Sequence, residues 1–264
     1  IVKKDNFFVK LKNNIYNMST FQKYVKDGFL SAILYALILS LILGGIKGFY
    51  VGVQTRNQIS ESVQEIKDPS NEFSIKNGEL SIKRNPTNID VGNTIIYVDS
   101  NIDLKHSEEL RNIYIHGDSY ILVLKDGLRI GSGEMSKDFT YKTLMMDNLN
   151  NEELANQLNT MGVIIVPVMT LVNMVQHLVD MLLNCLMATA IAIIIGTFMG
   201  LRMKVSAIYS LAIYASTLPS LILLPLSIVR PYIMFDVPFV IGTTIYMIFI
   251  LKYIKNEIIN NIKL

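Results

Sequence analysis

The stretch GFLSAILYALILSLILGGI, residues 28–46, contains no charged side chain and is nearly long enough to cross a bilayer. A helix needs about 20 apolar residues to cross a hydrocarbon core of about 30 Å. Lys47 follows at once, and its long side chain can reach the headgroup layer. The run therefore predicts a transmembrane helix over residues 28–50. A cleaved signal peptide is the alternative, although the run exceeds the usual apolar core and no A-x-A site follows it.

Three further apolar runs occupy the C-terminal half of the chain. The first predicts a long helix over residues 161–201, whose second half, MLLNCLMATAIAIIIGTFMGL, is long enough to span alone. Its first half contains Pro167 and several polar residues, so we expect that half to lie in or above the outer headgroup layer. The other two runs predict transmembrane helices over residues 205–229 and 237–254.

Lysine and arginine in short loops favour the cytoplasmic side of a membrane. They gather in the basic N-terminal segment 1–27, in the turn at Arg202 and Lys204, and near the tail 255–264. With four spans all three places fall on the inner side, and only Arg230 lies in an outer loop. The pattern predicts cytoplasmic termini for a multi-pass protein, with residues 51–160 forming an extracytoplasmic domain.

The composition supports this division. Of 264 residues 51% are hydrophobic and 17% are charged, whereas about 25% are charged in an average soluble domain. Residues 51–160 carry 11 Lys and Arg against 17 Asp and Glu, a net charge of −6, whereas residues 163–201 carry only Asp180. The overall net charge of +2 averages these unlike regions, so we expect no nucleic-acid partner. The single cysteine, Cys185, excludes a disulfide framework.

Alternating apolar residues and turn signals predict a small antiparallel β-rich domain over residues 51–160. Two hairpins are expected, with turns at Asn77-Gly78 and Asp126-Gly127, because such pairs favour two-residue turns. Further strands are expected at residues 94–100 and 138–144. Residues 51–70 are interpreted as a helical or extended connector, and residues 148–158 as a short helix that leads back to the membrane.

Signals for chemistry in this domain are few. Asp99, Asn101 and Asp103 resemble the start of a calcium loop, but leucines stand at the positions that need the turn glycine and the bidentate glutamate. His106 and His116 have no cysteine partners and no H-x-x-x-H spacing, which indicates surface or structural histidines. No hydrolase, zincin, Walker or dinucleotide motif is present. We therefore expect no enzyme, no metal and no cofactor.

Small residues recur every four positions in three of the apolar runs. Such stripes let membrane helices approach closely, and three of them favour a compact bundle. The fourth run has no such stripe and is expected at the periphery. The stripes consist of Ala32, Ala36, Ser40, Gly44 and Gly48; of Ala188, Ala192, Gly196 and Gly200; and of Ala212, Ser216 and Ser220.

Upstream of Ala188 the same helical face becomes polar, at spacings of three and four residues. One interpretation is a track for protons or ions, because ionisable groups that face a bundle interior are functional candidates. The simpler interpretation is that this part of the helix projects to the outer interface, where Asp180 forms an ion pair with Lys47. We favour the simpler one, because the inner half of the face offers an ion no further ligand. The stripe consists of Thr170, Asn173, His177, Asp180 and Asn184.

Three strings resemble a known family. FFVKLKNNIYNMSTFQKYVKDGFLSAILYALILSLI at residues 7–42, FSIKNGELSI at 73–82 and AIYASTLPSLI at 212–222 are similar to membrane proteins of Gram-positive bacteria grouped as the domain of unknown function 1189 family. The resemblance covers nearly the whole chain and implies a bacterial plasma membrane protein related to Yip-type multispanning proteins. Some members carry a maltodextrin-utilisation label. No catalytic or binding residues come with the resemblance.

The sequence therefore predicts a four-helix transmembrane bundle with an inserted outer domain, acting as a non-enzymatic sensor, scaffold or regulatory protein of the cell envelope. Its expected partners are the lipid bilayer and either an envelope protein or a second copy of the chain. A transporter, or an accessory subunit in maltodextrin or sugar uptake, is the alternative. An intramembrane hydrolase would need Ser40 or Ser216 to face His177 at one depth, and no sequence pattern places them together.

Overall fold

The computed structural model describes residues 5–91, 94–110, 119–133, 135–146, 148–230 and 233–262, so His116 lies outside the described residues. Contacts divide the chain into two compact units. The helical unit contains residues 1–55 and 165–264, and the β unit contains residues 56–164. The predicted boundaries of the inserted domain, residues 51–160, lie within a few residues of this division.

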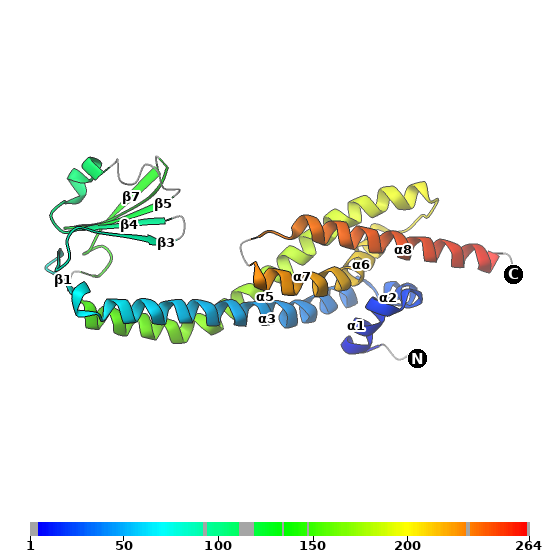
Figure 1. Cartoon of the computed structure of the whole chain (residues 1–264). Coiled ribbons are helices and arrows are strands. Elements are labelled where there is room, and N and C mark those ends of the chain that lie inside the picture. The colour runs from blue at the N-terminus through cyan, green and yellow to red at the C-terminus, as the bar shows by residue number, and fades with distance from the viewer. Residues whose placement is uncertain are drawn as a thin grey trace. The chain divides into compact units, whose positions relative to one another are not determined.

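Helices make up the helical unit (Figure 1). Among the described residues three of them, α3, α5 and α8, are long and apolar enough to cross a membrane, and the bent pair α6 and α7 could form a fourth span. Helices α3 and α5 each supply residues to both units. The helices are α1 (Phe7–Tyr16), α2 (Phe21–Lys26), α3 (Phe29–Ile66), α5 (Asn151–Phe198), α6 (Val205–Ala215), α7 (Thr217–Val229) and α8 (Asp236–Ile262), with a 3-10 turn, η1 (Met18–Thr20), between α1 and α2.

Helices α3 and α5 are longer than the sequence patterns predict. The segment expected to end at residue 50 continues to Ile66, so the connector at 51–70 is mostly helical. The helices expected at 148–158 and 161–201 are one helix, which begins where the Asn150 side chain accepts a hydrogen bond from the Glu153 amide. A hydropathy pattern does not predict polar helix ends of this kind, because packing and capping stabilise them and apolar residues do not mark them.

Close packing of α3 on α5 depends on glycine. A Cβ atom at Gly48 would lie 2.7 Å from both the Met169 carbonyl oxygen and the Thr170 Cα atom, which leaves no space for a side chain. Gly44 and Gly52 approach α5 in the same way, and the order of the contacts makes the two helices antiparallel. The predicted stripe on α3 is thus a helix-packing surface, because Ala32, Ala36, Ser40, Gly44 and Gly48 are all buried.

The other stripes are also buried, with one exception. Ala188, Ala192 and Gly196 of α5 are buried, as are Ala212 of α6, Ser216 at the break after it and Ser220 of α7. Gly200 is exposed, has a φ angle of 73° and lies beyond the last residue of α5. The Leu201 amide donates to the Gly196 carbonyl oxygen at 2.9 Å, so Gly200 ends the helix in a left-handed conformation and takes no part in packing.

The third apolar segment is broken at Ser216, where α6 and α7 meet at 43°. Pro219 explains the position of this break. A proline within a helix has no amide hydrogen for the carbonyl four residues earlier, and its ring clashes with that carbonyl. Four residues before Pro219 is Ala215, the last residue of α6. Ser216 and Thr217 donate their hydroxyl hydrogens to the carbonyl oxygens of Ile213 and Tyr214, which satisfies part of the exposed backbone.

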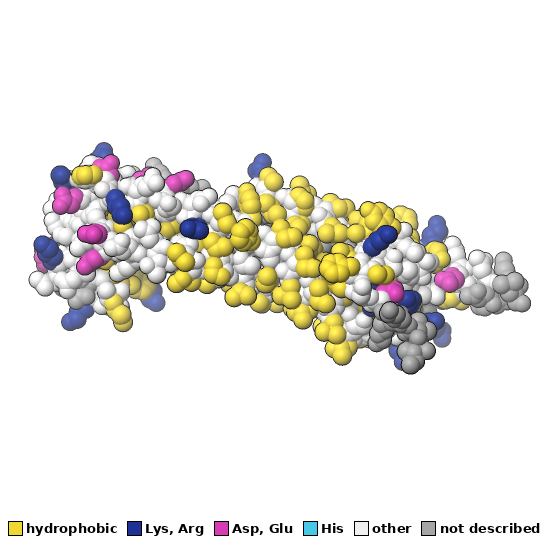
Figure 2. All heavy atoms as spheres, turned by 90° about the horizontal axis from the view of Figure 1, so that it is seen from below, with side chains coloured by type: hydrophobic (Ala, Val, Ile, Leu, Met, Phe, Trp, Pro, Cys, Tyr) yellow, Lys and Arg dark blue, Asp and Glu magenta, His cyan; other side chains and the backbone are white. Residues whose placement is uncertain are grey.

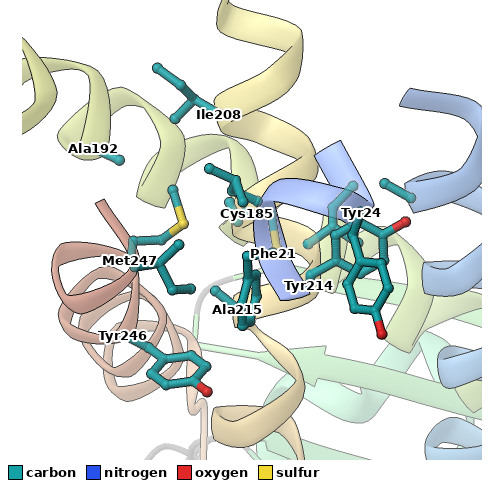
Figure 3. Packing of buried hydrophobic residues seen from close by; sticks show 14 of the residues in the cluster. Phe21, Tyr24, Cys185, Ala192, Ile208, Tyr214, Ala215, Tyr246 and Met247 are labelled. Atoms are coloured by element: carbon teal, nitrogen blue, oxygen red, sulfur yellow. The ribbon is translucent and has the colours of Figure 1, made fainter. Parts of the chain in front are cut away.

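The core of the helical unit gathers around α6. Figure 3 shows Tyr24 of α2 beside Tyr214 on one side of α6 and Met247 of α8 on the other, and the Phe21 ring packs against Tyr246 of α8. Met247, Ile250 and Thr243 of α8 are 0% exposed. The expectation that the fourth segment lies at the periphery is therefore wrong, because α8 packs on α6 and α7 through large side chains and needs no stripe of small residues.

The outer surface of the helices is apolar. Leu30, Leu171 and Phe249, for example, are 71%, 63% and 52% exposed. Figure 2 shows hydrophobic side chains spread over the helices, while charged side chains gather on the β unit and near the two termini. A soluble protein rarely exposes so large an apolar surface, so these helices are those of a membrane protein.

The β unit contains two sheets. In the first the strand order is β2-β1-β8, and in the second it is β3-β4-β5-β6-β7. The second sheet is mixed, because β4 and β5 are parallel, and this differs from the antiparallel domain predicted. The strands are β1 (Phe73–Lys76), β2 (Glu79–Ile82), β3 (Thr87–Val91), β4 (Thr94–Asp99), β5 (Ser119–Leu124), β6 (Gly127–Ser132), β7 (Met135–Thr140) and β8 (Leu149–Asn150), with 3-10 turns η2 (Pro69–Asn71) and η3 (Leu104–Leu110).

The first predicted hairpin is confirmed and the second is shifted. Asn77 and Gly78 have φ angles of 52° and 79°, as the predicted turn between β1 and β2 requires. The turn between β5 and β6 is formed by Lys125 and Asp126, because Leu124 pairs with Gly127. Gly127 belongs to β6, where a Cβ atom would collide with the carbonyl oxygen of Phe139. The strand expected at 138–144 is β7, which lies at 135–140.

Several ion pairs form within the β unit. Arg129 of β6 stands directly opposite Asp138 of β7, and the two form two hydrogen bonds, of 2.7 and 2.9 Å. The hydrogen bonds from Arg129 hold the pKa of Asp138 below its usual value. Asp103, from the rejected calcium pattern, accepts hydrogen bonds from the backbone amide and ring of His106, whose pKa this contact raises.

The glycine contacts lead to a paired prediction. Substitution Gly48→Ala should lower the free energy of unfolding by about 1–3 kcal/mol, because a new methyl group would collide with the α5 backbone. Gly45→Ala is the matched control. A methyl group there meets only the flexible end of the Met174 side chain, so stability should be unchanged or slightly higher. Thermal unfolding of both variants in the same detergent measures the difference, and equal effects would contradict the proposed close contact.

Candidate functional site

A cavity of about 310 Å³ lies within the helical unit, between α3, α5, α7, α8 and the segment that precedes α8. Its walls combine polar and apolar groups, the latter including Leu223 of α7 and Phe239 of α8. Ionisable groups that line a cavity in an apolar bundle mark a candidate functional site. The polar side chains of α3, α5 and α8 that line it are Lys47, Asn173, Gln176, His177, Asp180, Asn184 and Asp236.

Four residues of the predicted polar stripe line this cavity: Asn173, His177, Asp180 and Asn184. The regular turn of α5 places them on one face, as their spacing predicts. Thr170 does not line the cavity. Its hydroxyl donates to the Val166 carbonyl oxygen at 2.7 Å, within its own helix. Asn173 also donates to its own helix, at the Met169 carbonyl oxygen.

The predicted pair Lys47 and Asp180 is brought to the same cavity. Among the described residues no atoms of the two side chains approach within the 4.0 Å of an ion pair, so in this structure both charged groups face the cavity separately. The glycine packing of α3 explains why Lys47 is here. Its neighbours Gly45 and Gly48 lie against α5, which holds the Lys47 backbone close to the polar face.

Asp236, which no sequence pattern indicated, supplies a second carboxylate to the cavity. Its Oδ1 atom accepts a hydrogen bond from Asn184 Nδ2 at 2.6 Å, and this contact joins α8 to α5. Asp236 is the first residue of α8, where a negative charge is favoured by the helix dipole. An acidic residue directly before an apolar run was the available signal, but nothing local connected it with the stripe on α5.

The structure brings Ser40 and His177 together. His177 Nδ1 lies 3.1 Å from Ser40 Oγ, so a hydroxyl and a base meet at one depth. Ser216 is not part of this pair, because its hydroxyl donates to Ile213. Ser40 is only 1% exposed and does not line the cavity, and no third side chain among the described residues hydrogen-bonds the other ring nitrogen of His177. The pair lacks the access and the orienting group that an activated nucleophile needs.

Beyond the cavity the same face of α5 is tightly packed. Cys185, Ala188 and Ala192 are 0%, 0% and 1% exposed. No polar side chain continues the stripe past Asn184 until Thr189, whose hydroxyl donates to the Cys185 carbonyl oxygen of its own helix. The arrangement suits the binding of a polar molecule, because carboxylates, amides and one ammonium group meet aromatic and sulfur-containing walls.

A second polar cluster, also missed by sequence analysis, joins the N-terminal helices to the bundle. Lys10 of α1 is 4% exposed and forms an ion pair of 2.7 Å with Asp27. It also donates to the hydroxyls of Ser31 and Tyr214, at 2.9 and 3.3 Å. Burial lowers the pKa of Lys10, but the hydrogen bonds to Asp27 and Tyr214 outweigh that effect and leave the pKa above its usual value. Lys10 is therefore charged throughout the physiological range.

Comparisons with known proteins give a family and no function. A search of curated proteins and a search of solved structures each found no match. A family model described as Protein of unknown function (DUF1189) matches residues 8–251, which include the whole β unit, most of the helical unit and every residue that lines the cavity. Because the match covers most of the chain, this protein belongs to the DUF1189 family.

Proposed function

We propose that the protein is a non-enzymatic, four-span sensor or regulatory protein of the cell envelope, with its β unit on the outer side of the plasma membrane. The observation that carries this proposal is the course of α3 and α5. Each helix supplies residues both to the β unit and to the helical unit, and each lines the polar cavity. A partner bound to the β unit would act on two helices that glycine contacts lock together.

Charge supports the orientation. The turn between α5 and α6 carries Arg202 and Lys204, and α8 carries Lys252 and Lys255 near its end. These cations favour the cytoplasmic side, whereas the net charge of −6 over residues 51–160 creates no barrier to export. The bent pair α6 and α7 then forms the third span, because a bend of 43° preserves the direction of the chain across the bilayer.

Cysteine labelling tests the orientation. Ser136 is exposed on β7 and Asn260 is exposed near the end of α8. A membrane-impermeant maleimide added to intact cells should label Ser136→Cys and should leave Asn260→Cys unlabelled until the cells are broken. The wild-type chain is the control, because Cys185 is 0% exposed. If only Asn260→Cys were labelled on intact cells, the orientation would be the opposite of the one proposed, and the proposal would be wrong.

Replacement of the sheets tests the sensor role. Asn151 Nδ2 donates to the carbonyl oxygens of Ile66 and Asn71, so the chain enters and leaves the sheets at neighbouring points. A short Gly-Ser linker in place of residues 73–148 should therefore leave insertion and helix packing intact. We expect this variant to fail to complement a deletion of the gene. Full complementation by a variant without sheets would contradict a sensor whose input is the β unit.

The cavity favours a second candidate function, a transporter or an accessory subunit for sugar or ion uptake. Asp180 and Asp236 are the ionisable groups expected at such a site. Flux of maltodextrins and monovalent cations into proteoliposomes decides between the two functions. Because packing closes the α5 face beyond the cavity, we expect no flux with the wild-type chain. Flux that disappears in Asp180→Ala but persists in Thr170→Ala would establish the transporter instead.

A further inference from the structure

Helix α1 buries two polar side chains and exposes three apolar ones, which is unusual for a helix on a water-soluble surface. Its two buried side chains are those of Lys10 and Asn14, which are 4% and 0% exposed, and Phe7 and Leu11 beside them are partly buried against the core. Three of its exposed side chains are apolar, since Phe8, Val9 and Tyr16 are 70%, 42% and 80% exposed, and the fourth is Lys12. A helix on the surface of a soluble domain buries its apolar stripe instead.

This orientation is fixed by polar contacts. Lys10 reaches Asp27, and Asn14 donates to the Thr217 hydroxyl at 3.5 Å. The Asn14 carbonyl oxygen also accepts a hydrogen bond of 2.8 Å from Tyr246 of α8. Rotating α1 to bury Phe8 would break these contacts and leave the charge of Lys10 without Asp27. Separating such a buried pair is strongly unfavourable, so the apolar face stays outside.

The position of α1 along the bundle matches the depth of the bilayer interface. The rings of Phe7 and Tyr35 are 5.2 Å apart, and Tyr35 is six residues after Phe29, the first residue of α3. At 1.5 Å per residue this places α1 about 9 Å along the span. Tyr246 of α8 also contacts α1, and it lies six residues before Lys252, the first charged residue at the end of that span. Measured from Lys252, α1 is therefore at the same depth of about 9 Å. Interfacial helices bury their apolar face about 5–10 Å deep.

Charged residues around α1 are mostly basic. Lys12 lies on the exposed face of α1, on the helical row from Phe8 to Tyr16. At the same end of the bundle, where Figure 1 shows α1, α2, the start of α6 and the end of α8, the exposed cations are Lys26, Arg202, Lys204 and Lys252. Of the acids at this end, Asp5 and Asp27 are already paired, with Lys23 and Lys10, and Glu257 of α8 is the one described acid without an ion pair. This end therefore complements anionic lipid headgroups.

We propose that α1 is an in-plane membrane helix. Phe8, Val9 and Tyr16 lie among the lipid chains at the polar boundary, and Lys12 contacts headgroup phosphates. Helix α1 contacts α3 through Tyr35 and Ser31. Near these contacts α3 exposes the apolar side chains of Leu30 and Leu34. Lipid is the occupant that fits best, because it would cover the apolar side chains of both helices. The surface is independent of the sensor role proposed above, since it needs only a bilayer around the helices.

Tryptophan fluorescence tests this assignment, because the chain contains no tryptophan. The probes are Phe8→Trp and, as a second position, Tyr16→Trp, each in the full chain in lipid nanodiscs that hold one copy. Both replaced side chains are largely exposed, so the fold should tolerate the larger ring. Met135→Trp on β7, where the side chain is 79% exposed, is the control in water.

The two α1 probes should emit at shorter wavelength than the control. Lipids brominated close to the headgroup should quench them strongly, and lipids brominated near the bilayer centre should quench them less. The quenching should increase when phosphatidylglycerol replaces part of the phosphatidylcholine, and Lys12→Gln should remove that increase. Solvent-like emission without quenching would overturn the proposal. So would short-wavelength emission that appears only in discs with two copies, because the occupant would then be a second chain.

Discussion

The close approach of α3 to α5 is the constraint on which the other features of the helical unit depend. In lipid the hydrophobic effect does not hold helices together, so backbones must come near enough for van der Waals contact. Gly44, Gly48 and Gly52 allow that approach. The same contact sets Lys47 beside the polar face of α5 and brings Ser40 to His177. A side chain at the contact would move Lys47 away from the polar face of α5 and would also separate Ser40 from His177.

The features that could be predicted from sequence are those with a local cause. A run without charge is sufficient to predict an apolar helix, as at residues 28–46, and Asn77-Gly78 is sufficient for a turn with two positive φ angles. The polar stripe is similar, because helical spacing alone places His177 and Asp180 on one face. Pro219 was also a visible signal, and it explains the break that the pattern of apolar residues did not reveal.

The features that were missed depend on partners far away in sequence. Lys10 belonged to a basic segment expected in the cytoplasm, and its burial depends on an ion pair with Asp27 and on Tyr214, which is more than two hundred residues later. Asp236 joins the cavity through Asn184 of another helix. The parallel pairing of β4 with β5 follows from a crossover between strands, and alternation along a strand carries no information about the direction of its neighbour.

The bend at Ser216 also has a consequence for membrane thickness. As one straight helix the 11 residues of α6, Ser216 and the 13 residues of α7 would measure about 37 Å, which exceeds a typical hydrocarbon core. With α6 along the bilayer normal and α7 inclined by 43°, the span is about 32 Å long in projection. In the proposed four-span arrangement, straightening would thus create a hydrophobic mismatch, and a thicker bilayer would favour the straighter form.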